Sequence, residues 1–152
     1  MVDIVHRVGI KASVSEVYAA LATIDGLAGW WTRDTSGNSN PQGHITFRFH
    51  NPAGTEVGAF AMNVLDLAPE TLVRWRVQDG PAEWLGTEIE FLLSSDAGYT
   101  IVHFGHRRWR EEVEFMAHCS MKWATFLLSL RQFVETGRGQ PAPDDLKIDN
   151  WN

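Results

Sequence analysis

Residues 112–135 read EVEFMAHCSMKWATFLLSLRQFVE, and this stretch decides the fold. Its apolar positions recur every three or four residues, which is the spacing of one buried face of an amphipathic helix. The members of this face are Met116, Cys119, Trp123, Leu127, Leu130 and Val134. Gly137 ends the predicted helix, and the Gly and Pro residues that follow predict an extended tail over residues 138–152.

The segments before this helix alternate apolar and polar residues with a period of two, as half-buried strands do. Ile45, Phe47 and Phe49, which share one face, are the clearest example. Strands are predicted over residues 4–10, 44–50, 56–67, 72–77, 87–93 and 100–106. Short turns join the last five of them, which indicates an antiparallel sheet rather than a parallel one with crossover helices.

Two short helices are predicted after the first strand. Residues 14–23 carry a helical stripe that Ser13 or Ser15 can cap, and residues 27–31 form a second helical turn with two adjacent tryptophans. Residues 32–43 are rich in Ser, Gly, Asn and Thr and are predicted as a polar loop. This order predicts an α+β fold in which a curved antiparallel sheet wraps the long C-terminal helix. The space between sheet and helix could hold a small ligand.

Composition narrows the range of functions. At 152 residues the chain is predicted to be one domain over residues 1–152, with its core over about 4–137. The 13 basic and 19 acidic residues give a formal net charge of −6, which disfavours nucleic acid as a partner. Cys119 is the only cysteine, so no internal disulfide can form. Together with the absence of a signal-peptide pattern and of a long apolar run, this predicts a cytoplasmic protein without a membrane span.

Several local motifs occur in a fixed order along the chain. They are Val14-x-x-Val17-Tyr18-x-Ala20-Leu21 followed by Trp30-Trp31, Leu72-Val73-x-Trp75, Thr87-x-Ile89-x-Phe91-x-Leu93, Thr100-x-Val102-x-Phe104-x-His106, and Trp123-x-x-Phe126-Leu127-x-x-Leu130. In this order the chain resembles the START-like or SRPBCC superfamily, and within it the branch related to the C-terminal domain of the heat-shock-protein ATPase activator. Lys122 is a departure, because relatives often have Gly before the helix Trp.

The resemblance implies a helix-grip fold with an apolar cavity between the sheet and the last helix. Members of the superfamily bind lipids, polyketides, hormones or other apolar ligands, and some are cyclases, aromatases or self-sacrificing resistance proteins. The residues predicted to contact a ligand are Trp30, Trp31, Phe47, Phe49, Phe60, Met62, Trp75, Phe91, Phe104, His106, Cys119 and Trp123. Aromatic and Met surfaces suit flat apolar ligands, although ordinary core packing is the alternative for each of these side chains.

His106 is the one candidate for catalysis, because an imidazole that titrates near neutral pH can move protons. The alternative is a core histidine with satisfied hydrogen bonds. His118 and Cys119 do not suit a thiol nucleophile, since adjacent helix positions diverge by about 100°. The histidines are dispersed and no glycine-rich phosphate loop is present, so neither a metal nor a cofactor is predicted.

Three functions therefore stay open. The first is binding of a small apolar or aromatic ligand in the cavity. The second is an enzyme of the polyketide cyclase or aromatase kind, with His106 moving protons. The third is a protein-interaction module like the chaperone ATPase activator, with Trp31, Trp84 and Trp151 as candidates for an exposed patch. A homodimer is also possible.

Overall fold

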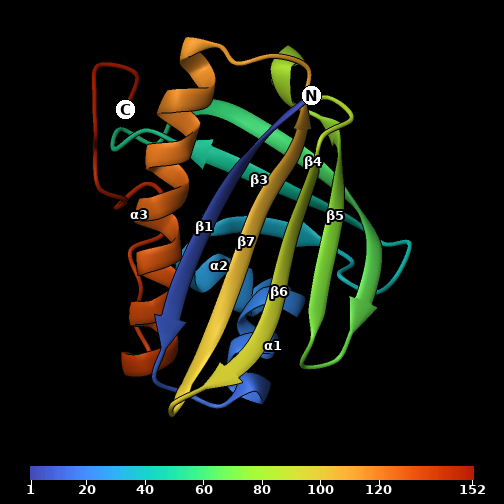
Figure 1. The fold of residues 1–152 in the computed structure, drawn as a ribbon. Helices are drawn as coiled ribbons and strands as arrows, with labels where there is room; N and C mark the ends of the chain where they lie inside the picture. Colours follow the sequence, from blue (N-terminus) through green and yellow to red (C-terminus); the bar gives the residue numbers. More distant parts are fainter.

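Seven strands form one antiparallel sheet in the computed structural model, which describes residues 1–152 (Figure 1). The strands are β1 (Val2–Ile10), β2 (Asp34–Gly37), β3 (His44–His50), β4 (Glu56–Ala68), β5 (Leu72–Asp79), β6 (Glu88–Asp96) and β7 (Tyr99–Trp109). Their order across the sheet is β1-β7-β6-β5-β4-β3-β2, and every neighbouring pair is antiparallel. The predicted α+β helix-grip fold is confirmed.

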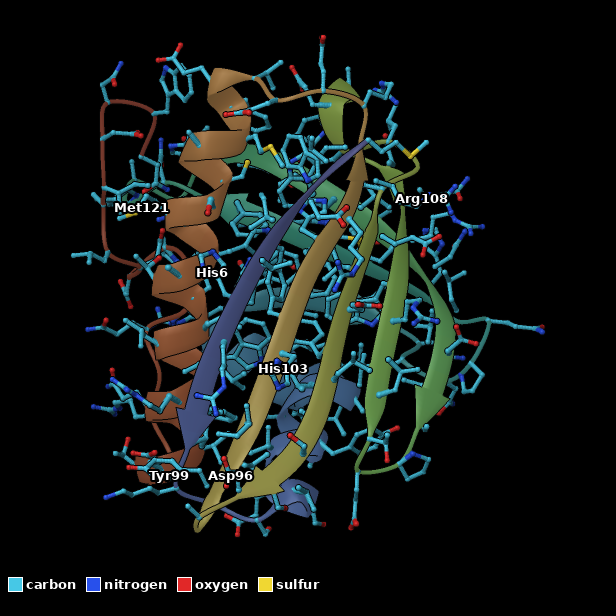
Figure 2. All side chains as sticks on the ribbon, in the orientation of Figure 1. His6, Asp96, Tyr99, His103, Arg108 and Met121 are labelled. Carbon is cyan, nitrogen blue, oxygen red and sulfur yellow. The ribbon has the colours of Figure 1, made fainter.

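The period of two places one apolar face of the sheet against the helices. Phe47, Met62, Trp75, Phe91 and Phe104 come from five different strands, and each is at most 2% exposed. Neighbours in this row meet across the strands, as Phe91 does with Phe104 in register. The core therefore lies on the concave side of the sheet, and His103 projects from the outer face of β7 (Figure 2).

Two short helices follow β1, as predicted: α1 (Val14–Ala22) and α2 (Ile24–Trp30). The Ser13 hydroxyl accepts the Glu16 amide at the start of α1, and Thr23 accepts the Gly26 amide at the start of α2. Gly26 is required where the helices meet, because a Cβ at this position would lie 2.7 Å from the Ala20 Cα. This tight corner directs Trp30 and the following Trp31 into the core.

The long helix α3 (Glu114–Thr136) lies along the concave side of the sheet beside β1 (Figure 1). It begins two residues after the predicted start, and Gly137 ends it with a left-handed φ of 85°. Met116, Cys119, Trp123, Leu127 and Leu130 of the predicted stripe are buried. No helix of the chain combines the length and the apolar character that crossing a membrane requires.

Two elements were not predicted from the sequence. β2 lies inside the segment predicted as a polar loop and pairs with β3 from Asp34 opposite Arg48 to Gly37 opposite Ile45. This edge strand is held by backbone pairing and is half-exposed, so it has no apolar alternation to reveal it. A short 3-10 turn, η1 (Ala82–Trp84), lies in the loop after β5 and buries Trp84.

The tail after α3 has no helix, and it runs back along α3 (Figure 1). Its backbone is fixed at Ala142, which exchanges hydrogen bonds with the Trp31 carbonyl (2.8 Å) and the Arg33 amide (3.1 Å). Ser129 of α3 accepts the Gln140 amide at 2.8 Å. These contacts hold the C-terminal residues against the helix and beside the pocket described next.

Candidate ligand pocket

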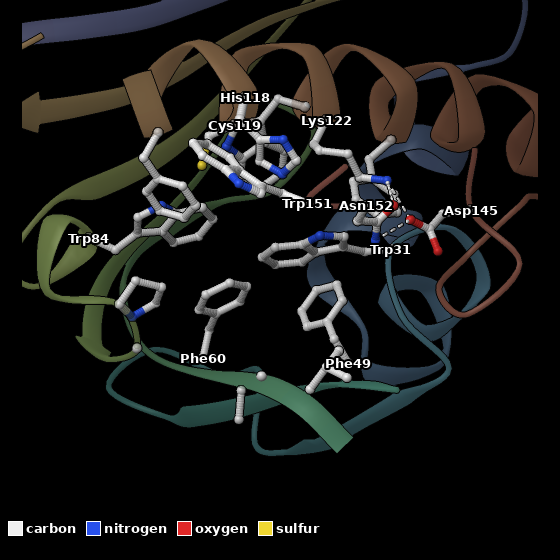
Figure 3. A pocket seen from close by; sticks show the side chains of 18 of the residues that line it. Trp31, Phe49, Phe60, Trp84, His118, Cys119, Lys122, Asp145, Trp151 and Asn152 are labelled. Atoms are coloured by element: carbon white, nitrogen blue, oxygen red, sulfur yellow. Dashed lines mark hydrogen bonds and ion pairs between the residues drawn. The ribbon is translucent and has the colours of Figure 1, made fainter. Parts of the chain in front are cut away.

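A pocket of about 500 Å³ lies between β4, α3 and the C-terminal tail (Figure 3). It is lined by Trp31, Phe49, Val57, Gly58, Ala59, Phe60, Asp79, Gly80, Pro81, Trp84, Phe115, His118, Cys119, Lys122, Trp123, Phe126, Asp145, Trp151 and Asn152. β4 contributes small residues to this lining, and α3 contributes aromatic ones. A cavity of this size and apolar character suits a small organic ligand.

Aromatic rings form the walls of the pocket. Phe60 and Trp84 stack with ring centroids 4.3 Å apart and planes inclined by 8°. Trp31 packs against Trp123 with centroids 4.9 Å apart, and Phe49 meets Phe60 edge-on at 5.2 Å. Figure 3 shows Trp31, Phe49, Phe60 and Trp84 around the cavity below α3. Flat π surfaces on several sides favour a ligand that can stack.

The structure places the residues predicted to contact a ligand in two groups. Trp31, Phe49, Phe60, Cys119 and Trp123 line the pocket. The others do not line it and lie in the surrounding core, where all are at most 2% exposed: Trp30, Phe47, Met62, Trp75, Phe91, Phe104 and His106. The concave face of the sheet extends beyond the pocket. These side chains are therefore packed among other core residues and do not border the open space.

Several lining residues were not predicted from the sequence. Gly58 and Ala59 supply the floor, and the only signal for Gly58 is its place on the apolar face of β4. Asp145, Trp151 and Asn152 come from the tail, which shows no periodicity. Only the tertiary structure places these residues beside the cavity.

His106 lies behind the pocket in a closed hydrogen-bond chain. Its Nδ1 accepts the indole N–H of Trp123 at 3.1 Å, which leaves Nε2 to donate to the Thr87 hydroxyl at 2.8 Å. Thr87 in turn donates to the Trp84 carbonyl at 2.6 Å. Burial lowers the pKa of His106 to about 3, so the ring is neutral at neutral pH. This geometry is that of a core histidine which fixes Trp84 and Trp123.

We expect the free energy of unfolding to fall on acidification because of His106. The unfolded chain binds a proton on this ring below its ordinary pKa of 6.5, whereas the folded protein keeps it neutral down to about 3. Unfolding therefore takes up a proton between these values, and stability falls by up to about 1.4 kcal/mol per pH unit. Urea unfolding of the wild type and His106→Gln across this interval measures the slope. Equal slopes in both proteins would contradict the assignment.

Cys119 is buried in the pocket wall and has no thiolate character at neutral pH. Burial raises its pKa to about 12, and the neighbouring Trp84 side chain opposes this shift only in part. His118 points its Nδ1 to Asp149 of the tail at 2.7 Å rather than to the thiol. No group of three or more His, Cys, Asp or Glu side chains is arranged to hold a metal ion.

A buried ion pair joins the pocket wall to the tail. The Lys122 ammonium donates to the Asp145 carboxylate and, at 3.0 Å, to the Asn152 side chain (Figure 3). It also donates to the Leu146 carbonyl at 2.8 Å. The same ammonium lies 5.0 Å from the Phe126 ring centroid. Burial alone would raise the pKa of Asp145, but Lys122 and then Lys147 outweigh it and lower that pKa. Lys122 is thus the anchor of the tail.

Comparison with known proteins defines the relatives of the chain. The model of a family described as activator of Hsp90 ATPase homolog 1-like protein matches residues 11–135. The solved structure of the Aha1 dimer from Colwellia psychrerythraea is 45% identical, with 91% of this chain and 100% of that chain covered and a TM-score of 0.81. No curated protein matches the chain in sequence.

More distant structures share the fold alone. CalU16 from Micromonospora echinospora is 20% identical over 93% of this chain and 77% of its own, with a TM-score of 0.68. DynU16, from the dynemicin biosynthetic locus, is 18% identical over 90% of this chain and 48% of its own, with a TM-score of 0.71. The sheet that grips a C-terminal helix therefore persists at low identity, while the pocket lining has to be judged from this chain's own residues.

Proposed function

We propose that this chain, which belongs to the family of activator of Hsp90 ATPase homolog 1-like proteins, binds a small apolar or aromatic ligand between its sheet and α3. The observation that supports this proposal is the pocket of about 500 Å³, whose walls are stacked aromatic rings. A core that only needed to be filled would leave no open volume of this size beside these rings. A cytoplasmic location stays part of the proposal.

A variant that fills the pocket tests the proposal. Gly58 lines the cavity, and a Cβ added there meets no atom within 4 Å, so a large side chain can enter without a clash at its base. We expect Gly58→Trp to leave the melting temperature unchanged or slightly raised and to weaken binding of an aromatic probe by about tenfold or more. Calorimetric titration with 2-naphthylacetamide measures the affinity.

The matched control adds an aromatic ring away from the pocket. Leu92 lies on the outer face of β6 and is 38% exposed, so Leu92→Phe should bind the probe as the wild type does. Equal probe affinity in Gly58→Trp and Leu92→Phe would place binding elsewhere and reject the proposal. Thermal unfolding of both variants ensures that a loss of affinity does not come from a loss of fold.

A chaperone partner is a second candidate function. It is supported by the 45% identity with the Colwellia Aha1 protein and by the family description. The expectation that Trp31 and Trp84 belong to an exposed patch is wrong, because these side chains are 2% and 4% exposed. Trp151 is 50% exposed and is the one that fits such a contact. Stimulation of a purified Hsp90-type ATPase, and its loss in Trp151→Ala, is the test.

The cyclase or aromatase alternative has less support in this chain. It depended on His106, which lies outside the pocket lining with both ring nitrogens engaged by protein groups. A homodimer stays a proposal too, supported by the similarity to the Colwellia Aha1 protein, whose solved structure is that of a dimer. Light scattering of the purified protein over a range of concentrations would decide it.

A further inference from the structure

We propose that the pocket selects a cationic apolar ligand, an aromatic or alkyl group that carries an ammonium head, over an anionic one of the same shape. This inference rests on the proposed function and names the ligand class for the same site. It follows from three features of the lining. The lining carries more negative than positive charge, its one ammonium group already has three hydrogen-bond acceptors, and its aromatic rings attract cations.

The charged residues of the lining leave an excess of negative charge. They are Asp79, Lys122 and Asp145, with His118 as a further titratable group. Asp145 is neutralised by Lys122, and its second cation, Lys147, lies outside the lining with its side chain 47% exposed. Asp79 forms no ion pair and accepts only the Gly80 amide, at 2.9 Å. No arginine lines the pocket. The unbalanced charge of the site is therefore a carboxylate at its rim.

Lys122 is not available to an anion. An ammonium group has three donor protons, and those of Lys122 have three acceptors in Asp145, the Leu146 carbonyl and the Asn152 side chain. A ligand carboxylate could reach this group only by displacing one of these acceptors, and displacing Asp145 would leave that buried carboxylate with only the exposed Lys147 as its counter-charge. His118 is likewise bound to Asp149. The anionic group of such a ligand would thus lose its hydration on binding without gaining an unpaired cation as a partner.

The aromatic walls add attraction for positive charge. Phe49, Phe60, Trp84 and Trp151 line the pocket with Trp31 and Trp123, and the negative face of a π system attracts an ammonium head near its centroid. The site already shows this contact between Lys122 and Phe126. An organic cation can therefore place its apolar part between the rings while its head stays near Asp79. The net charge of −6 of the whole chain acts in the same direction.

Three probes with one aromatic body separate charge from shape: (2-naphthylmethyl)trimethylammonium, 2-naphthylacetamide and 2-naphthylacetate. Calorimetric titration of the full chain should give the tightest binding for the cation, about tenfold tighter than the neutral amide, with the acetate weakest. Added salt should weaken binding of the cation more than binding of the amide, because Asp79 is exposed to solvent and its attraction for the cation is screened. Acetate that binds as tightly as the cation would overturn the inference.

Asp79→Asn is the variant that tests the role of the carboxylate. It removes the charge and keeps an oxygen that can accept the Gly80 amide. We expect it to reduce the ratio of cation to amide affinity about threefold or more. The control is Glu70→Gln, an exposed carboxylate in the turn at the opposite end of β5, which should leave the ratio unchanged. An unchanged ratio in Asp79→Asn would overturn the assignment of Asp79.

The outcomes also separate this inference from the function on which it rests. If the amide binds and Gly58→Trp removes its binding while the cation shows no advantage, the pocket function stands and the charge preference is rejected. If none of the three probes binds, both are rejected. Thermal unfolding of each variant verifies that it is folded before its affinities are compared.

Discussion

Replacing Lys122 by methionine is expected to lower the free energy of unfolding by about 3 kcal/mol. Methionine keeps the length and apolar contacts of the stem but removes the ammonium group. Asp145 is 6% exposed and would lose its closest counter-charge, while the Leu146 carbonyl and Asn152 would lose a donor. Breaking one partner of a buried pair costs more than the pair contributes, because the other charge stays buried.

The matched control is Lys147→Met, which removes the second cation on the same carboxylate. The side chain of Lys147 is 47% exposed, so its contact with Asp145 at 3.1 Å is screened by water and should contribute less than about 1 kcal/mol. Urea unfolding compares the two variants, and limited proteolysis reports whether the tail detaches first. Equal stability losses in the two variants would contradict the role assigned to Lys122.

The pH dependence of the pair supplies an independent measurement. The pKa of Asp145 is lowered in the folded protein, so the pair stabilises the fold above the ordinary value of 3.8. This contribution is lost as the pH falls through the lower folded pKa. In Lys122→Met the part of the acid-side stability loss that comes from Asp145 should be smaller, because the cation that does most to lower its folded pKa is gone.

Truncation of Trp31 to alanine is expected to have a stability effect of similar size, about 3–5 kcal/mol. Trp31 is 2% exposed, and its ring packs against Phe47 at 4.3 Å and Trp123 at 4.9 Å between centroids. Its removal leaves a cavity continuous with the pocket, so affinity for an aromatic probe should fall as well. Urea unfolding and calorimetric titration measure the two effects.

Trp151→Ala is the control for this second prediction. Trp151 also lines the pocket but is 50% exposed, so its truncation should cost about 1 kcal/mol or less. A comparison of the two variants separates the structural role of a tryptophan in the core from the role of one at the pocket mouth. If Trp31→Ala were no more destabilising than Trp151→Ala, the packing described for Trp31 would be wrong.

The sequence predicted which residues face the concave side of the sheet, but not which of them line the pocket. Alternation on the strands correctly indicated which side chains point inward, but it does not say which inward residues border open volume. Phe60 and Phe91 have the same pattern around them, yet only Phe60 lines the cavity. The difference arises because α1 and α2 cover one end of the sheet, while small residues at Gly58 and Ala59 leave space at the other.

The chain's sequence by itself determined the α+β class, the antiparallel pairing and the stripe of α3, because periodicity and turn residues are local properties. Only the tertiary structure decided that the tail returns to the pocket, where Asp145 meets Lys122 although the two lie 23 residues apart. It also decided that His106 is buried and therefore neutral, with its ring nitrogens bonded to Thr87 and Trp123. Burial and charge pairing depend on which distant residues come together, and no local pattern contains that information.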